Sequence, residues 1–166
     1  MTTADVLIVI DMQKGVCHYE NQTIGQFDRL VSGINDRIAA YVYENKPVIF
    51  VQHTDDYLVR GTEKWEVLAE LNKDQAHYFI EKKHPNAFYQ TELKYVLDKL
   101  DTRSLEICGA ETQYCVDSTV KFAHGLGYAI IMEKGLHTSW DNNWMSAEDT
   151  VKFYESIWND QFVTFI

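Results

Sequence analysis

Prolines, glycines and positive charges are all scarce in this chain. Only two prolines and eight glycines interrupt 166 residues, of which 46% are apolar. A chain this apolar and this seldom interrupted can bury a core, which excludes a disordered protein. The sequence has no linker, internal repeat or low-complexity tract, so its length predicts one domain over residues 1–166.

The charge balance is acidic. Asp and Glu number 25 against 15 Lys and Arg, which gives a net charge of −10. Nucleic-acid binding needs clustered Lys and Arg, so we expect no nucleic-acid partner. The first apolar run, Val6–Ile10, is too short for a signal segment or a membrane span, so we expect no membrane partner either.

Cysteine is rare as well. Three cysteines, an odd number, follow an N-terminus without a basic segment, which predicts reduced thiols and a cytoplasmic location. Cys108 lies in an apolar run and is typical of a small core residue. Cys115 differs, because its neighbours Thr112, Gln113 and Asp117 are polar.

Short β-branched runs alternate with longer amphipathic stretches along the whole chain. This alternation predicts an α/β fold, with a parallel sheet covered by helices on both faces. The expected strands are 6–10, 47–51, 76–80, 104–108, 128–132 and 162–166, and the expected helices are 26–44, 91–100, 116–126 and 146–158, with a short one at 65–71.

Three chemically capable residues each follow one of these strands. In open α/β sheets, ligands bind beyond the carboxyl ends of the strands, where Asp11, Lys82 and Cys115 are expected. A thiol at a helix N-terminus should have a lowered pKa. Asp11 could accept the thiol proton, while Lys82 keeps the thiolate and the carboxylate ionised. Each residue taken alone has an ordinary structural explanation. Asp11 could be a turn residue, and Lys82, which is next to Lys83, could lie on a solvated surface.

Two classes of function fit a reactive cysteine. One is a hydrolase, and the other is a redox- or ligand-sensing protein that uses Cys115 as a reactive thiol, with Cys17 as its resolving partner. Sensing needs no Asp or Lys on other strands, whereas hydrolysis does. The presence of Asp11 and Lys82 therefore favours the hydrolase.

Three motifs resemble the isochorismatase-like cysteine hydrolases, which include nicotinamidases and N-carbamoylsarcosine amidase. They are Asp-Met-Gln at 11–13, Lys-Lys-His-Pro-Asn-Ala-Phe-Tyr-Gln-Thr-Glu-Leu at 82–93, and Gly-Ala-Glu-Thr-Gln-Tyr-Cys-Val at 109–116. The resemblance implies a doubly wound, six-stranded sheet of order 3-2-1-4-5-6 and a catalytic triad of Asp11, Lys82 and Cys115. It also implies a non-proline cis peptide at Ala110–Glu111, which helps to direct backbone N–H groups toward an oxyanion.

The activity implied by this resemblance is hydrolysis of a small amide, or a related C–N bond, through a thioester. No cofactor is expected, and relatives assemble as dimers or tetramers, so a homo-oligomer is expected. The identity of the amide or ureido substrate is not predicted, since pocket residues decide it. Residues expected to line the pocket are His53, Phe88, Tyr114 and Trp140, with Trp144 and His137 as further candidates.

One departure concerns metal binding. Nicotinamidases of this family carry a metal site with an Asp-x-His pair after the second strand, where this chain has His53-Thr54-Asp55. His53 and Asp55 could ligate a divalent ion. A strand-end histidine followed by an acidic turn is the preferred description, so we predict no catalytic metal.

Overall fold

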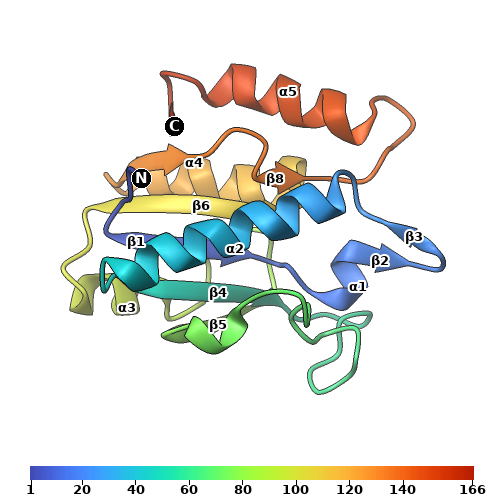
Figure 1. Ribbon diagram of the computed structural model, residues 1–166, viewed down its shortest axis with the longest axis horizontal. Coiled ribbons are helices and arrows are strands. Elements are labelled where there is room, and N and C mark those ends of the chain that lie inside the picture. The colour runs from blue at the N-terminus through green and yellow to red at the C-terminus, as the bar shows by residue number, and fades with distance from the viewer.

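The computed structural model describes residues 1–166, and its centre is a mainly parallel sheet (Figure 1). Its spatial order is β5-β4-β1-β6-β7-β9, and the short strand β8 also pairs with β6. Counted along the chain without β8, this is the predicted order 3-2-1-4-5-6, which is confirmed. The strands are β1 (Val6–Ile10), β4 (Val48–His53), β5 (Tyr78–Lys82), β6 (Ser104–Ala110), β7 (Ala129–Met132), β8 (His137–Thr138) and β9 (Thr164–Phe165).

Helices cover both faces of the sheet, as the sequence predicted. Helix α2 crosses the front of the sheet in Figure 1, while α3 and α4 lie behind it. No helix combines the length and the apolar character that a membrane crossing requires. The helices are α1 (Lys14–Cys17), α2 (Phe27–Tyr43), α3 (Leu93–Lys99), α4 (Asp117–Gly125) and α5 (Ala147–Trp158), and a small hairpin joins β2 (His18–Tyr19) to β3 (Gln22–Thr23).

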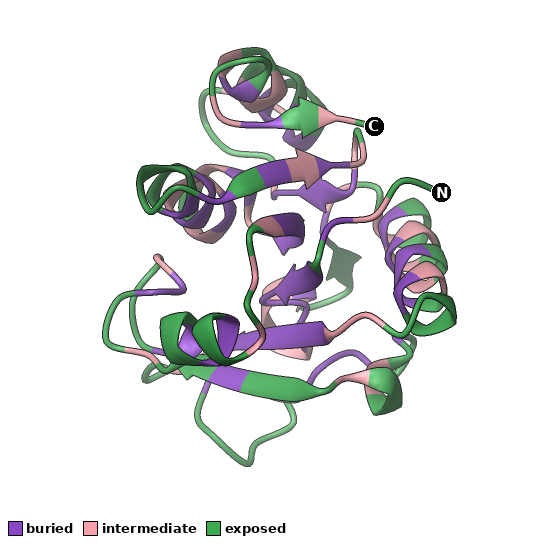
Figure 2. Cartoon of the chain, turned by 90° about the vertical axis from the view of Figure 1, so that its left-hand side faces the viewer, coloured by how far each residue is buried: buried purple, intermediate pink, exposed green.

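The central strands are buried on both sides, which explains their continuous apolar runs. Figure 2 shows buried residues concentrated in the strands and exposed residues on the outer sides of the helices. Side chains alternate between the faces: Leu7 and Val9 pack in the cluster that includes α2, whereas Ile8 and Ile10 pack in the cluster that includes α3 and α4.

A buried ion pair joins α2 to the sheet. Arg37 of α2 binds Glu106 of β6 through two hydrogen bonds of 2.6 Å, and both side chains are almost inaccessible. The Tyr41 hydroxyl donates to the same carboxylate at 2.8 Å and accepts from the backbone N–H of Ala4. This network satisfies the Glu106 charge inside the protein.

The expected short helix at 65–71 is wrong. This segment is irregular: it forms turns, and part of its backbone bonds to the chain that follows β1. The N–H of Leu68 donates to the carbonyl of Met12, and the N–H of Lys14 donates to the carbonyl of Glu66. Tertiary hydrogen bonds thus override a helical pattern and seat this loop beside the end of β1.

Candidate active site

Asp11 lies immediately after β1, at the carboxyl end of the sheet. Its φ of 49° is in the left-handed region, which residues other than glycine seldom adopt and which is found disproportionately at functional sites. The residue is only 2% exposed. Its Oδ2 accepts a hydrogen bond from Lys82 at 2.6 Å, whereas its Oδ1 is buried without any partner.

Lys82 is the last residue of β5, and its fully buried ammonium contacts three side chains of the site. Its Nζ lies 2.6 Å from Asp11 Oδ2, 2.9 Å from His53 Nδ1 and 3.2 Å from Cys115 Sγ. An ammonium has three N–H donors and no acceptor, so these three contacts use all of them. The sequence prediction that Asp11, Lys82 and Cys115 share one edge therefore matches their positions in the structure.

His53 is a neutral member of this group. Because Lys82 can only donate, His53 Nδ1 accepts and the ring proton resides on Nε2, which faces Asp55 Oδ2 at 3.4 Å. Burial and then the Lys82 ammonium lower the pKa of His53, which agrees with a neutral ring. Gln13 holds the residue in place, since its side chain bonds both the N–H and the carbonyl of His53.

Cys115 sits in a π-helical turn, Thr112–Val116, between β6 and α4. Close approach of β6 to β1 positions this turn: a Cβ at Gly109 would lie 2.1 Å from the Ile10 carbonyl oxygen, and φ there is +119°. Only glycine suits such a position. The peptide bond between Ala110 and Glu111, at the end of β6, is cis.

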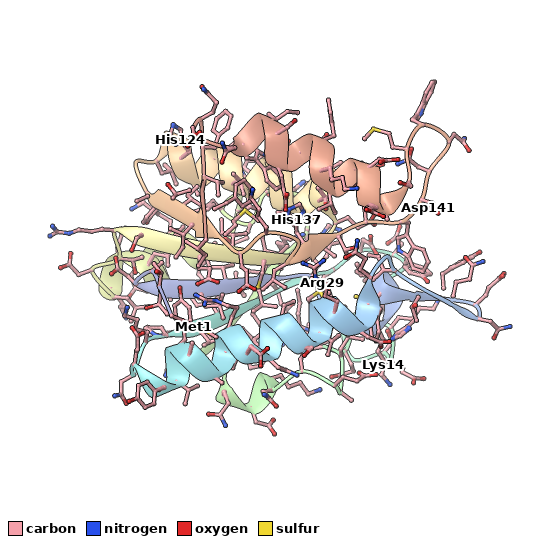
Figure 3. All side chains as sticks on the ribbon, turned by 45° about the horizontal axis from the view of Figure 1, so that its top comes forward. Met1, Lys14, Arg29, His124, His137 and Asp141 are labelled. Carbon is pink, nitrogen blue, oxygen red and sulfur yellow. The ribbon has the colours of Figure 1, made fainter.

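Buried His137 fixes the start of the same turn. It belongs to β8, and its Nδ1 lies 2.9 Å from the Thr112 hydroxyl oxygen. Its Nε2 lies 3.4 Å from a carboxylate oxygen of Glu155 on α5. Figure 3 shows the labelled His137 in the interior, between α5 and the sheet. His137 therefore holds the turn that carries Cys115 and does not line the pocket, contrary to the sequence expectation.

The thiol's ionisation differs from the sequence prediction. Burial, followed by the neighbouring Asp11 carboxylate, raises the pKa of Cys115 to about 12, although Lys82 opposes this. The prediction of a lowered pKa is wrong, because it considered the helix N-terminus and left out burial and the Asp11 charge. The resting protein thus holds a protonated thiol beside a carboxylate that can accept its proton.

Alkylation should reveal this raised pKa directly. We expect the rate of iodoacetamide labelling at Cys115, followed by mass spectrometry, to rise without a plateau up to about pH 10, since an ordinary thiol titrates near 8.5. Asp11→Asn should move the profile to lower pH by removing a negative charge. Cys108, fully buried, should stay unlabelled and serves as the internal control. A wild-type plateau at or below the ordinary thiol value would contradict the burial argument.

A cavity of about 530 Å³ opens above these residues. In Figure 3, Lys14 and Asp141 mark the end of the molecule where it lies, and His124 marks the opposite end. The hairpin β2–β3 and the loop after β4 form walls that the sequence analysis missed, because no spacing signal links them to Cys115. The lining residues are Asp11, Gly15, Val16, Tyr19, Gln22, His53, Asp55, Tyr57, Leu58, Pro85, Glu111, Tyr114, Cys115 and Trp140.

The expected pocket residues divide into two groups. His53, Tyr114 and Trp140 line the cavity. Phe88 does not, and that expectation is wrong: it packs in the core, with ring centroids 5.6 Å from Phe122 and 6.0 Å from Tyr128. Apolar neighbours on α4 and immediately before β7 surround the ring, so burial in the core is favoured over the cavity wall. Trp144 is 91% exposed and also lies outside the cavity.

The possible metal-ligating atoms of the site lie close to a lysine. Asp11, His53 and Cys115 bring one ligand atom each within 4.8 Å of one another. The Lys82 ammonium, however, contacts an atom of all three. Asp55 is engaged in a turn, where its Oδ1 accepts the backbone N–H groups of Tyr57 and Leu58. Asp11 and Cys115 are therefore arranged around a lysine, whereas His53 Nε2 and Asp55 Oδ2, 3.4 Å apart, form no hydrogen bond with it. The absence of a catalytic metal stays a prediction.

Comparisons with known proteins agree with this geometry. A sequence profile described as the isochorismatase domain matches residues 5–147. A crystal structure of an isochorismatase family protein superposes with a TM-score of 0.93 at 37% identity, covering 97% of this chain and 96% of that one. The nicotinamidase of Staphylococcus aureus shares the fold, with a TM-score of 0.78 at 20% identity over 97% of this chain and 96% of its own. The secreted isochorismatase effector Isc1 of Verticillium dahliae is 24% identical over 135 residues, which are 79% of this chain and 70% of that protein. The chain therefore belongs to the isochorismatase family of hydrolases.

Proposed function

We propose that this protein hydrolyses the C–N bond of a small amide or ureido compound through a thioester on Cys115. The observation that carries the proposal is the position of Lys82 Nζ, 2.6 Å from the Asp11 carboxylate and 3.2 Å from the Cys115 sulfur. A nucleophile, a proton acceptor and a fixed positive charge thus meet at the floor of a cavity of suitable size.

In the first half-reaction, Asp11 accepts the thiol proton as the Cys115 sulfur attacks the substrate carbonyl carbon. A thiol with a pKa of about 12 stores no thiolate, so proton transfer accompanies the attack. Backbone N–H groups near Glu111 and Cys115 stabilise the oxyanion. Asp11 then protonates the leaving nitrogen, the C–N bond breaks, and a thioester and a free amine or ammonia result.

In the second half-reaction, Asp11 deprotonates a water molecule that attacks the thioester carbonyl. The carbon–sulfur bond breaks, the carboxylic acid leaves, and Asp11 returns the proton to the Cys115 sulfur. Oδ1 of Asp11 supports this role, because it is a buried acceptor without a hydrogen-bond partner in the structure. Lys82 keeps its positive charge throughout and stabilises carboxylate and thiolate in turn.

The thioester should be trapped by removing the base. In Asp11→Asn at alkaline pH, p-nitrophenyl acetate should acylate Cys115, because loss of the Asp11 charge lowers the thiol pKa, hydroxide removes the thiol proton, and the activated leaving group needs no proton. The acyl group should persist longer than in wild type, because water lacks its base. Intact mass followed by peptide mapping would measure it. Cys115→Ala is the matched control and should stay unmodified. Acylation of another residue, or equally rapid loss of the acyl group in Asp11→Asn and wild type, would contradict the mechanism.

The sensing alternative gains no support from Cys17. That thiol is fully buried in the core beside α2, it does not line the cavity, and burial raises its pKa far above the usual range. A resolving thiol needs to be accessible and readily ionised. The hydrolase is therefore the function that we propose, with a small molecule as its substrate; assembly into a dimer or tetramer stays a prediction of the resemblance.

A further inference from the structure

The active-site cavity is lined by carboxylates and by no Lys or Arg. The carboxylates are Asp11, Asp55 and Glu111. Lys82 lies beneath the floor, and its three N–H donors are already used within the site. Its charge balances that of Asp11, so the charges left facing the cavity are those of Asp55 and Glu111.

Neither of these two carboxylates has a lysine or arginine partner. Glu111 accepts a hydrogen bond from the Ser139 hydroxyl at 3.1 Å and forms no ion pair. Burial and the nearby Asp11 charge raise the pKa of Glu111, so a cation placed beside it would relieve this repulsion. Hydrogen bonds from the N–H groups of Leu58 and Tyr57 hold the pKa of Asp55 below its usual range, which keeps it negative.

Four aromatic rings from separate segments complete the wall: Tyr19, Tyr57, Tyr114 and Trp140. The faces of such rings attract cations, and trialkylammonium groups are the ligands they recognise best. Tyr57 already holds one cation, since Lys64 Nζ lies 3.8 Å from its ring centroid. Trp140 is fixed in place, because its indole N–H donates to the Val16 carbonyl at 2.9 Å.

An independent feature indicates where the amide would lie. Asp11 is 2% exposed and lines the cavity, and its Oδ1 has no hydrogen-bond partner. A buried acceptor of this kind is stabilised by an N–H donor from a ligand. Cys115 is beside it, so the scissile amide would occupy the floor and the remainder of the substrate would extend along the acidic and aromatic walls.

We propose that the cavity selects substrates with a positively charged amine or quaternary ammonium group close to the scissile amide. This inference rests on the proposed function for the reaction, but it concerns recognition alone. Glu111 and the Trp140 face would contact the cation, while Asp11 and Cys115 would meet the amide. An anionic substituent in the same position would be repelled by Asp55 and Glu111.

A pair of isosteric amides tests this selectivity. Glycine betaine amide carries a trimethylammonium group. Its uncharged isostere is 3,3-dimethylbutanamide, called tert-butylacetamide below, in which a carbon atom replaces the quaternary nitrogen. Calorimetry on Cys115→Ala protein, which cannot turn the ligands over, should give a Kd about tenfold lower for the cationic amide, a difference of about 1.4 kcal/mol. Glu111→Gln, added to this protein, should reduce the ratio to about threefold or less. Glu148→Gln on exposed α5 is the matched control and should leave the ratio unchanged.

The outcomes separate recognition from chemistry. Equal binding of the two amides, or tighter binding of tert-butylacetamide, would overturn the proposal. A ratio of the two Kd values that Glu111→Gln leaves unchanged would overturn it as well. If the cationic amide binds preferentially but wild-type protein releases no ammonia from it, selectivity stands and the proposed hydrolysis of such amides fails. If wild-type protein hydrolyses tert-butylacetamide with the higher kcat/KM, hydrolysis stands and the cation selectivity fails.

Discussion

Replacement of Cys115 with alanine should lower kcat/KM for the proposed amide hydrolysis by roughly 10⁴-fold or more, since a nucleophile and its partners act as one unit. The remaining groups cannot substitute for the sulfur. Asp11 is held by Lys82 at 2.6 Å and accepts protons rather than forming acyl bonds, and the neutral His53 accepts from the same ammonium. Without the thiol, no thioester forms and hydrolysis loses its two-step route.

The measurement is ammonia release from the amide that wild-type protein hydrolyses fastest. Cys108→Ala is the matched control, because Cys108 is a buried core thiol on β6 of the same protein. Its replacement removes a small apolar group, so we expect some loss of stability and nearly unchanged kcat/KM. Substantial turnover by Cys115→Ala would assign the chemistry to another group, and equal losses in both variants would indicate a folding defect.

Arg37→Met should lower the free energy of unfolding by about 3–5 kcal/mol, the typical effect of removing one partner from a buried ion pair. Glu106 is 1% exposed and receives two hydrogen bonds from Arg37. After the substitution it would keep only the Tyr41 hydroxyl as a side-chain donor. A buried carboxylate without a counter-charge is costly, whereas methionine fills much of the volume of the arginine stem.

Urea unfolding followed by tryptophan fluorescence would measure the change. The double variant Arg37→Met/Glu106→Leu should recover part of the loss, because no uncompensated charge stays in the core. Lys94→Met is the matched control: Lys94 pairs with Asp98 on the exposed surface of α3, and such pairs contribute about 0.5 kcal/mol. If Arg37→Met costs no more than Lys94→Met, the buried network is not a major source of stability.

The sequence determined the layout of the fold because its signals are local. The apolar runs of β1 and β4 predict strands that are buried on both faces, and the sheet has them. The same reasoning placed Asp11, Lys82 and Cys115 at one edge, because the carboxyl ends of parallel strands meet there. The resemblance implied Lys82 as the lysine of the triad, and Lys82 is the residue whose ammonium contacts the thiol.

Tertiary structure alone decided the electrostatics and the walls of the site. The pKa of Cys115 is raised because of burial and the Asp11 charge, which come from segments distant in the sequence, although Lys82 opposes them. Phe88 points into the core and Tyr19 lines the cavity for a related reason, since each depends on what packs against its loop. Periodicity reports the neighbours of a residue along the chain, whereas desolvation, charge pairing and cavity shape depend on neighbours in space.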